Sequence, residues 1–221
     1  MLDAALSCFW GRGYEATSIR DLADAMRISG PSLYNAFGDK RSLFLYALDH
    51  YCSTRTHPML VRFEQNRAGA AAIAAFFAEI VDRSVTDRER RGCFLINSAL
   101  DVAPHDKAMA KVVATHLGAI RAFLFRNFEA AHATGETTIS PDANAAADHL
   151  LAVLLGIRVL ARTRPDRGLL EGIVGSALRS LGVSRSRPAE TRSGPSVVTV
   201  RQNARRLADH RSETKQVRSK T

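Results

Sequence analysis

Cysteine is scarce in this sequence of 221 residues, which has three, at Cys8, Cys52 and Cys93. Because their number is odd and they lie far apart, the sequence gives no sign of a disulfide framework. Free thiols are typical of a reducing compartment, so we expect a cytoplasmic protein. Cys93 follows a glycine near the start of an expected helix, where a thiol can be activated and sense oxidants, but a buried inert thiol is the better interpretation.

Long apolar runs are also missing. No run approaches the roughly 18 residues that a membrane span needs. The first ten residues carry Asp3 in place of the basic stretch that opens a signal peptide. We therefore expect no membrane partner and no secretion signal.

Clusters of catalytic or metal-binding residue types are absent from the sequence as well. His105, Asp106 and His116 lack a compact ligand spacing, and the cysteines form no C-x-x-C pair. No nucleophile, base and orienting group can be assembled from the sequence. We expect a protein that is not an enzyme and that needs no metal or cofactor.

Strand-like alternation does not recur, and the helix formers Ala, Leu, Arg and Glu dominate. With 46% hydrophobic residues the chain can bury a substantial core, and the fold class we expect is all-α. Pro58 is expected to interrupt the chain after a fourth helix. Beyond it, apolar positions at helical spacing predict helices over about 68–84, 92–102, 107–132, 143–162 and 167–182.

Positive charge is concentrated at one end of the chain. Of the net charge of +9, residues 184–221 contribute +7, whereas residues 1–183 contribute only +2. The same stretch is rich in Arg and Ser and has little apolar periodicity, so we expect a basic, largely disordered tail. The net charge is therefore weak evidence about the folded part.

The N-terminal stretch predicts short helices separated by tight turns. Ser18 and Asp21 have the spacing of a capping box that begins a second helix. A turn of a few residues follows, and Ser29 is a good cap for a third helix. Two helices joined in this way form a helix-turn-helix, whose second helix lies in the DNA major groove. An ordinary hairpin of two helices shows the same caps, so periodicity alone leaves both interpretations open.

The stretch FWGRGYEATSIRDLADAMRISGPSLYNAFGDKRSLFLYAL resembles the TetR/AcrR family of transcriptional regulators. The family pattern has an aromatic and a Gly-Tyr near the end of the first helix, then Thr-Ser, a Val/Ile-Ser turn, Leu-Tyr-x-x-Phe and a Lys that opens the fourth helix. The matching residues here are Phe9, Gly13, Tyr14, Thr17, Ser18, Ile28, Ser29, Leu33, Tyr34, Phe37 and Lys40. Residues 92–104, GCFLINSALDVAP, also resemble a segment of the regulatory domain in one branch of this family.

The resemblance implies a helix-turn-helix DNA-binding domain over residues 1–50, a helical effector-binding and dimerisation domain over 51–183, and the basic tail over 184–221. It implies a ligand-responsive regulator, most often a repressor. Such a protein reads a palindromic double-stranded DNA operator as a homodimer and is released by a small-molecule effector.

Contacts with DNA are implied by position for residues of the second, third and fourth helices. For some of them a structural role is the alternative: Ser18 and Ser29 as helix caps, Tyr34 as a packing residue and Lys40 as a solvated charge. The full set is Thr17, Ser18, Arg27, Ser29, Gly30, Pro31, Ser32, Tyr34, Asn35 and Lys40.

Three features depart from the family pattern. Arg27 stands where the family usually has a glycine with positive φ, which costs on the order of 1 kcal/mol if the left-handed conformation is kept. Gly30-Pro31 replaces the usual Lys-Gly and removes a charged contact. Met1 almost opens the first helix, so either a preceding basic segment is absent or the start site is misassigned.

The later helices hold the candidates for an effector pocket, which we expect to be largely apolar with a few polar groups. Phenylalanine at helical spacing is more often core than pocket, and a satisfied core amide is the alternative for the asparagine. The candidate lining residues are Phe76, Phe77, Phe94, Asn97, Phe123, Phe128 and His149.

Two late apolar stretches, DHLLAVLLGIRVLAR and LLEGIVGSALRSL, are candidates for a dimer interface, with an intrachain core as the alternative. Two other functions also stay open. A degenerate family member would act as a dimeric binding module without operator recognition. Alternatively, the basic tail would bind nucleic acid without sequence preference.

Overall fold

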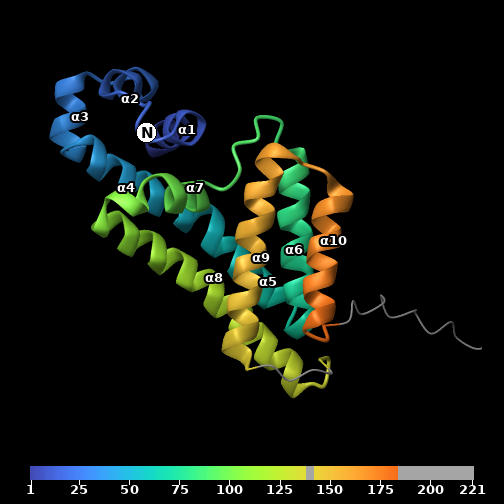
Figure 1. The fold of residues 1–221 in the computed structure, drawn as a ribbon. Coiled ribbons are helices and arrows are strands. Elements are labelled where there is room, and N and C mark those ends of the chain that lie inside the picture. The colour runs from blue at the N-terminus through green and yellow to red at the C-terminus, as the bar shows by residue number, and fades with distance from the viewer. Residues whose placement is uncertain (138–141, 184–221) are drawn as a thin grey trace, which may run out of the picture. The chain divides into compact units, whose positions relative to one another are not determined.

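Helices account for nearly all of the computed structural model, which describes residues 1–137 and 142–183 (Figure 1). Within these residues the one β pairing is an isolated bridge between Thr137 and Val183. The predicted all-α fold class is therefore confirmed. The tail predicted over 184–221 lies outside the described residues.

The N-terminal head, residues 1–51, is built around the aromatic side chains of its first and fourth helices. Phe9 packs edge-on against Phe44, with 5.1 Å between ring centroids, and Tyr14 packs on the same phenylalanine at 5.0 Å. Leu6, Phe9 and Phe44 are fully buried. The helices of the head are α1 (Leu2–Arg12), α2 (Ile19–Met26), α3 (Gly30–Phe37) and α4 (Lys40–Tyr51).

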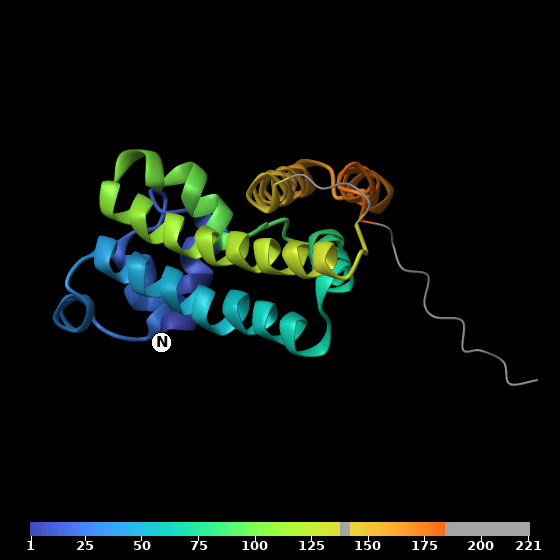
Figure 2. The ribbon, with the colours of Figure 1, turned by 90° about the horizontal axis from the view of Figure 1, so that it is seen from below.

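The body, residues 52–183, contains six α-helices in its described part. The long α8 packs against both α6 and α9, and α9 and α10 lie side by side (Figures 1 and 2). Apart from α5, the bounds agree with the predicted ranges to within two residues. They are α5 (His57–Asn66), α6 (Gly69–Thr86), α7 (Phe94–Asp101), α8 (Lys107–Ala133), α9 (Ala143–Thr163) and α10 (Arg167–Ser180).

The prediction that Pro58 interrupts the chain after the fourth helix is wrong. A π-helical turn over Cys52–Thr56 joins α4 directly to α5, and Pro58 lies in the first turn of α5. The backbone N–H of His57 donates to the carbonyl of Cys52, five residues back. Because this turn is wider than an α-helical turn, the proline ring avoids the clash that it causes inside a regular helix.

The hydroxyl groups of Ser53 and Thr54 support the wide turn. Both donate to the carbonyl of His50, at 3.1 and 2.6 Å. The two hydroxyl groups thus add side-chain hydrogen bonds to the backbone where the helix changes its winding. The helical rod from Lys40 to Asn66 therefore runs without a break from the head into the body.

The sequence-based exclusion of membrane-spanning length was too strict. Two helices of the described residues, α8 and α9, are long and apolar enough to cross a membrane, each with a mean hydropathy of 1.4 over 18 residues. Both contribute side chains to the core, including Phe123 from α8 and Leu150 from α9. Core helices of water-soluble bundles pass the same test, so this finding is weak evidence for a membrane partner.

Candidate DNA-binding and effector-binding sites

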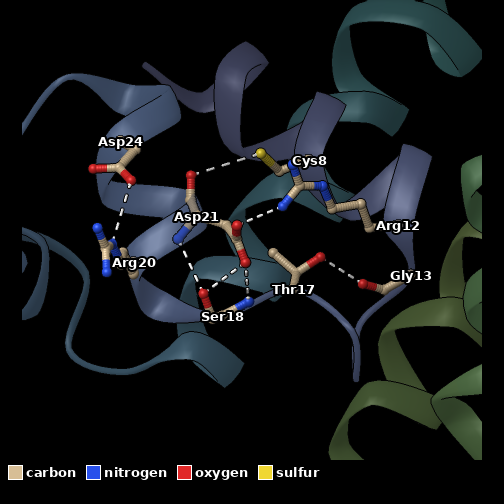
Figure 3. Close-up of polar contacts among 8 residues, drawn as sticks. All are labelled: Cys8, Arg12, Gly13, Thr17, Ser18, Arg20, Asp21 and Asp24. Atoms are coloured by element: carbon tan, nitrogen blue, oxygen red, sulfur yellow. Dashed lines mark hydrogen bonds and ion pairs between the residues drawn. The ribbon is translucent and has the colours of Figure 1, made fainter.

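A complete capping box fixes the start of α2 (Figure 3). The Ser18 hydroxyl accepts from the backbone N–H of Asp21 at 3.1 Å, and the Asp21 carboxylate accepts from the backbone N–H of Ser18 at 2.9 Å. Arg12 at the end of α1 also pairs with Asp21. The hydrogen bonds from Ser18, and then from Arg12, lower the pKa of Asp21 to about 2. The first two helices are thus tied together at one ionised carboxylate.

The turn after α2 keeps the left-handed conformation for which the family usually has a glycine. Arg27 has φ 57° and ψ 45°, and its backbone N–H donates to the carbonyls of Ala23 and Asp24. Its side chain is exposed. An arginine is therefore held at a position that favours glycine, with its guanidinium free to reach a ligand outside the head.

The N-terminal half of α3 presents small and polar groups to solvent. Ser29 caps the helix by accepting from the backbone N–H of Ser32 at 3.2 Å. On the opposite side Leu33 is fully buried and fixes the helix to the head, whereas Tyr34 is 51% exposed. Ser29, Pro31, Ser32, Tyr34 and Asn35 are exposed, and Gly30 is half-buried.

Phe37 is less buried than its spacing from Leu33 predicts. It is half-buried and contacts Tyr46 of α4, with 6.1 Å between ring centroids. Leu33 is therefore the main anchor of α3. Tyr34 is the one large side chain on the exposed side of this helix, and its neighbours there are small or polar, as a helix that enters a DNA groove requires.

The structure places Thr17 where its side chain cannot touch a phosphate. Thr17 is fully buried, and its hydroxyl donates to the carbonyl of Gly13 at 2.6 Å (Figure 3). The prediction that this side chain contacts a phosphate is therefore wrong. Its role is structural, because its hydrogen bond closes the loop between α1 and α2. The neighbouring Ser18 remains exposed.

Lys40 at the start of α4 is half-buried and lies over the ring of Tyr14, at 4.5 Å from its centroid. Its Nζ also donates to the carbonyl of Glu15 at 3.4 Å. These contacts hold the ammonium group beside the loop that precedes α2. A cation held at that point adds to the helix N-terminus as a site for an anion.

The seven candidate pocket residues do not come together in one place. Phe76 contacts Phe77 and Phe123, each at 5.3 Å between centroids, and Phe123 and Phe128 are fully buried core residues. Phe94 packs instead against aromatic side chains of the head, among them Phe44 at 5.3 Å.

The two polar candidates also lie apart. Asn97 is half-buried, and its amide donates to the carbonyl of Arg91 at 2.7 Å, which is the satisfied amide that the sequence left open as the alternative. His149 is exposed on α9. Neither residue contacts the Phe76–Phe123 group.

Two adjoining cavities, the outer one between head and body and the inner one mainly within the body, were not predicted. The inner one, of about 30 Å³, is lined mainly by apolar side chains, including Phe76, and the outer one, of about 420 Å³, opens to solvent. Tyr51 and Arg158 line both. The sequence signal that could have pointed here is the single arginine in the apolar run LLAVLLGIRVLA.

The outward side of α9 carries exposed apolar residues. Val159 is 42% exposed and Leu160 39% exposed, although both belong to a strongly apolar stretch. Leu154 and Ile157 of the same helix are buried in the core. One side of α9 therefore packs in the core of this chain. The other side is apolar and is not covered by any of the described residues.

Comparison with known proteins places both halves of the chain. Residues 1–47 match the model described as bacterial regulatory proteins, tetR family, and residues 69–174 match the tetracyclin repressor-like C-terminal domain. The chain is 32% identical over 186 residues to the uncharacterized HTH-type transcriptional regulator YezE of Bacillus subtilis, covering 82% of this chain and 94% of the relative. It is 29% identical over 180 residues to the HTH-type transcriptional repressor ComR of Escherichia coli, covering 80% and 85%.

Solved structures give the same answer. A cysteine-substituted form of the TetR family regulator CifR, complexed with 26-base-pair double-strand operator DNA, aligns with a TM-score of 0.71 and 31% identity. The alignment covers 81% of this chain and 94% of that one. A helix-turn-helix head, a helical body and relatives along most of the chain agree: this protein belongs to the TetR family of transcriptional regulators.

Proposed function

We propose that the protein binds double-stranded operator DNA as a homodimer, with α3 in the major groove, and that a small molecule bound in the body changes its affinity for the operator. It works in the cytoplasm and as a repressor. The observation that carries the proposal is the outward side of α3, where Ser32, Tyr34 and Asn35 are exposed while Leu33 anchors the helix. The complex of CifR with 26-base-pair operator DNA supports operator binding by this chain, which is 31% identical to CifR.

The homodimer in this proposal is supported by the exposed apolar side of α9. The apolar side of α9, with Val159 and Leu160, is free for a second copy, and α10 lies beside it. Two heads related by a twofold axis read two half-sites of a palindrome. Each half-site is then contacted by the α3 helix of one subunit.

The test is a gel-shift titration on the DNA that flanks the protein's own gene, with unrelated DNA as competitor. The wild-type shift is expected to resist the competitor. Tyr34→Ala is expected to weaken it by about tenfold, and Tyr34→Phe reports how much of that loss belongs to the hydroxyl. A competitor-sensitive shift that is indifferent to Tyr34 contradicts the proposal.

A second candidate function is non-specific binding through residues 184–221, favoured by their charge of +7. Deletion of these residues separates the two functions. Operator binding through α3 should survive the deletion with a weaker dependence on salt, whereas binding driven by the tail should disappear.

A further inference from the structure

Arg158 on α9 is a buried cation without an acidic partner. It is 8% exposed, and its guanidinium donates to the Ser84 hydroxyl at 2.9 Å and to the carbonyl of Gly92 at 3.1 Å. No carboxylate pairs with it anywhere in residues 1–137 and 142–183. A guanidinium has five N–H groups, so hydrogen bonds to two acceptors leave N–H groups that can still donate to a ligand. Buried charges are normally paired because removing them from water is costly.

The two cavities meet at this guanidinium. The inner cavity is apolar apart from a few groups, with Met59, Ile96, Ile120 and Leu154 in its wall. The outer cavity has a polar wall with five arginines and two acids, Asp87 and Glu89, so its charge is positive on balance. A molecule that reaches Arg158 from solvent would therefore have apolar walls ahead of it and cations around its entrance.

Two of the four arginines at the entrance lie beside carboxylates, whereas Arg55 and Arg88 pair with none among the described residues. Arg83 pairs with Glu79, and Arg91 lies beside Glu89. Arg55 pairs with no carboxylate in the described residues and lies over the rings of Trp10 and Tyr51, at 5.2 and 5.9 Å from their centroids.

Arg55 and Arg158 thus line both cavities as two uncompensated positive charges, one at the rim and one buried. Fork-shaped guanidinium groups bind carboxylates through paired, charge-assisted hydrogen bonds.

We propose that the effector of this regulator is a small organic carboxylate whose anionic head binds Arg158 and Arg55 and whose apolar part enters the inner cavity. This rests on the proposed function, because it names the chemical class of that effector. The inner cavity of about 30 Å³ holds one water molecule, so the apolar part enters only as side chains such as Met59 move. A small apolar part needs the least rearrangement of this cavity, so we expect a small acid, with short-chain acids favoured over ring acids.

The same site has a direct route to the DNA-binding head. Trp10 of α1 lines the outer cavity, and its Nε1 donates to the carbonyl of Arg91 at 3.2 Å. The guanidinium of Arg91 lies 4.7 Å from the centre of its ring. A carboxylate that draws Arg55 away from Trp10 changes the contacts that hold α1 against the body. Differential contacts of this kind are what a ligand needs to shift a conformational equilibrium.

Trp10 also provides the measurement, because it is the single tryptophan of the chain. The full-length protein is titrated with butyrate, hexanoate and cyclohexanecarboxylate at constant ionic strength, and with the three corresponding amides. At least one acid is expected to change the Trp10 emission saturably, with an affinity at least about tenfold above that of its amide. The amides have the same shape but no charge, so the ratio isolates the anionic head.

Arg158→Gln is expected to abolish the preference for acid over amide. Arg162→Gln, four residues further along α9 and exposed, is the matched control and is expected to keep it. Should Arg158→Gln fail to fold, Arg55→Gln replaces an exposed residue and is expected to weaken acid binding severalfold.

Three results overturn the proposal: no saturable change with any acid, equal affinity for acids and amides, or an undiminished preference in Arg158→Gln and Arg55→Gln. A gel shift on the same preparations distinguishes this failure from failure of the proposed function. Operator binding without an acid preference overturns the carboxylate site alone. An acid preference without operator binding overturns the proposed function and leaves the site in place.

Discussion

Arg41 in the first turn of α4 and Asp106 at the start of α8 form a two-point ion pair. Arg41 Nη2 donates to Asp106 Oδ1 at 2.9 Å, and Nε donates to Oδ2. The same carboxylate caps α8 by accepting from the backbone N–H groups of Ala108 and Met109, at 2.9 and 3.0 Å. The hydrogen bonds from Arg41, and then those from the backbone, hold the pKa of Asp106 well below its ordinary value. One carboxylate therefore stabilises a helix of the body and holds a helix of the head.

Asp106→Asn keeps a cap acceptor and removes the charge, so we expect a lower melting temperature at neutral pH. Because the pKa of Asp106 is depressed in the folded state, its stabilisation is present above the ordinary value of 3.8 and is lost as the pH falls below it. The difference in melting temperature between wild type and variant, measured by thermal unfolding, should be constant from about pH 8 to 5 and should shrink below about pH 4. Asp101→Asn, at the exposed end of α7, should show no gap at any pH.

Arg27→Gly should stabilise the head. A non-glycine residue at φ 57° carries a backbone cost, and its removal is expected to raise the free energy of unfolding by about 1 kcal/mol, measured in urea. If the guanidinium contacts DNA, operator affinity falls at the same time. Arg90→Gly is the matched control, because Arg90 has φ 51° but lies between α6 and α7. It should gain stability and keep operator affinity; no gain in either variant contradicts the strain argument.

Val159→Glu should weaken the dimer. A carboxylate on the apolar side of α9 would have to be buried between two copies, so the monomer–dimer equilibrium is expected to shift by at least about tenfold. Light scattering during gel filtration over a dilution series measures this. Val61→Glu, on an equally exposed valine of α5, should leave the equilibrium unchanged. Equal effects of the two substitutions would place the interface elsewhere.

Acid should destabilise the protein through His116. This residue of α8 is 6% exposed, with Nδ1 3.4 Å from His57 Nε2 of α5 and Nε2 3.6 Å from the Asp49 carboxylate of α4. Burial lowers the pKa of His116, the charge of His57 lowers it further, and Asp49 opposes both. The folded state therefore takes up this proton less readily than the unfolded chain. Stability is full above pH 6.5 and falls as the pH drops below that value.

The free energy of unfolding in urea, measured from pH 7.5 to 5.5, tests this directly. His116→Gln should flatten the decline, whereas His105→Gln, at an exposed position, should leave it unchanged. A decline of the same slope in wild type and in His116→Gln would contradict the assignment of the effect to this imidazole.

Local chemistry made part of this molecule predictable. Residue type and spacing predict the caps Ser18 and Ser29, and each accepts the backbone hydrogen bond that defines a cap. Such contacts join residues three apart in the chain, so sequence alone describes them. The family pattern marked Arg27 as a position that favours glycine but left its conformation open, and the structure shows it to be left-handed.

Other features depend on contacts between residues far apart in the chain, which the sequence does not reveal. Thr17 resembled a phosphate ligand, but the fold of the loop from Gly13 buries its hydroxyl. The Arg158 site depends on Ser84 at the end of α6 and Gly92 before α7, far from Arg158 in sequence. The seven pocket candidates share only their residue types. Residue type does not say whether a side chain lines a cavity, or which one.

The π-helical turn between α4 and α5 has a geometric consequence for the whole rod. In an uninterrupted α-helix the buried stripe that includes Leu48 and Tyr51 would continue at Arg55; instead Arg55 is exposed and Thr56 is buried. The buried positions after the turn are therefore shifted by one residue along the chain, which corresponds to about 100° of rotation about the helix axis. If the wide turn migrated along the chain by one position, each residue it passed would rotate by that angle. Such a shift would re-aim Arg55 by a change of angular phase alone, with no bend and no broken helix, while the helix on either side kept its orientation.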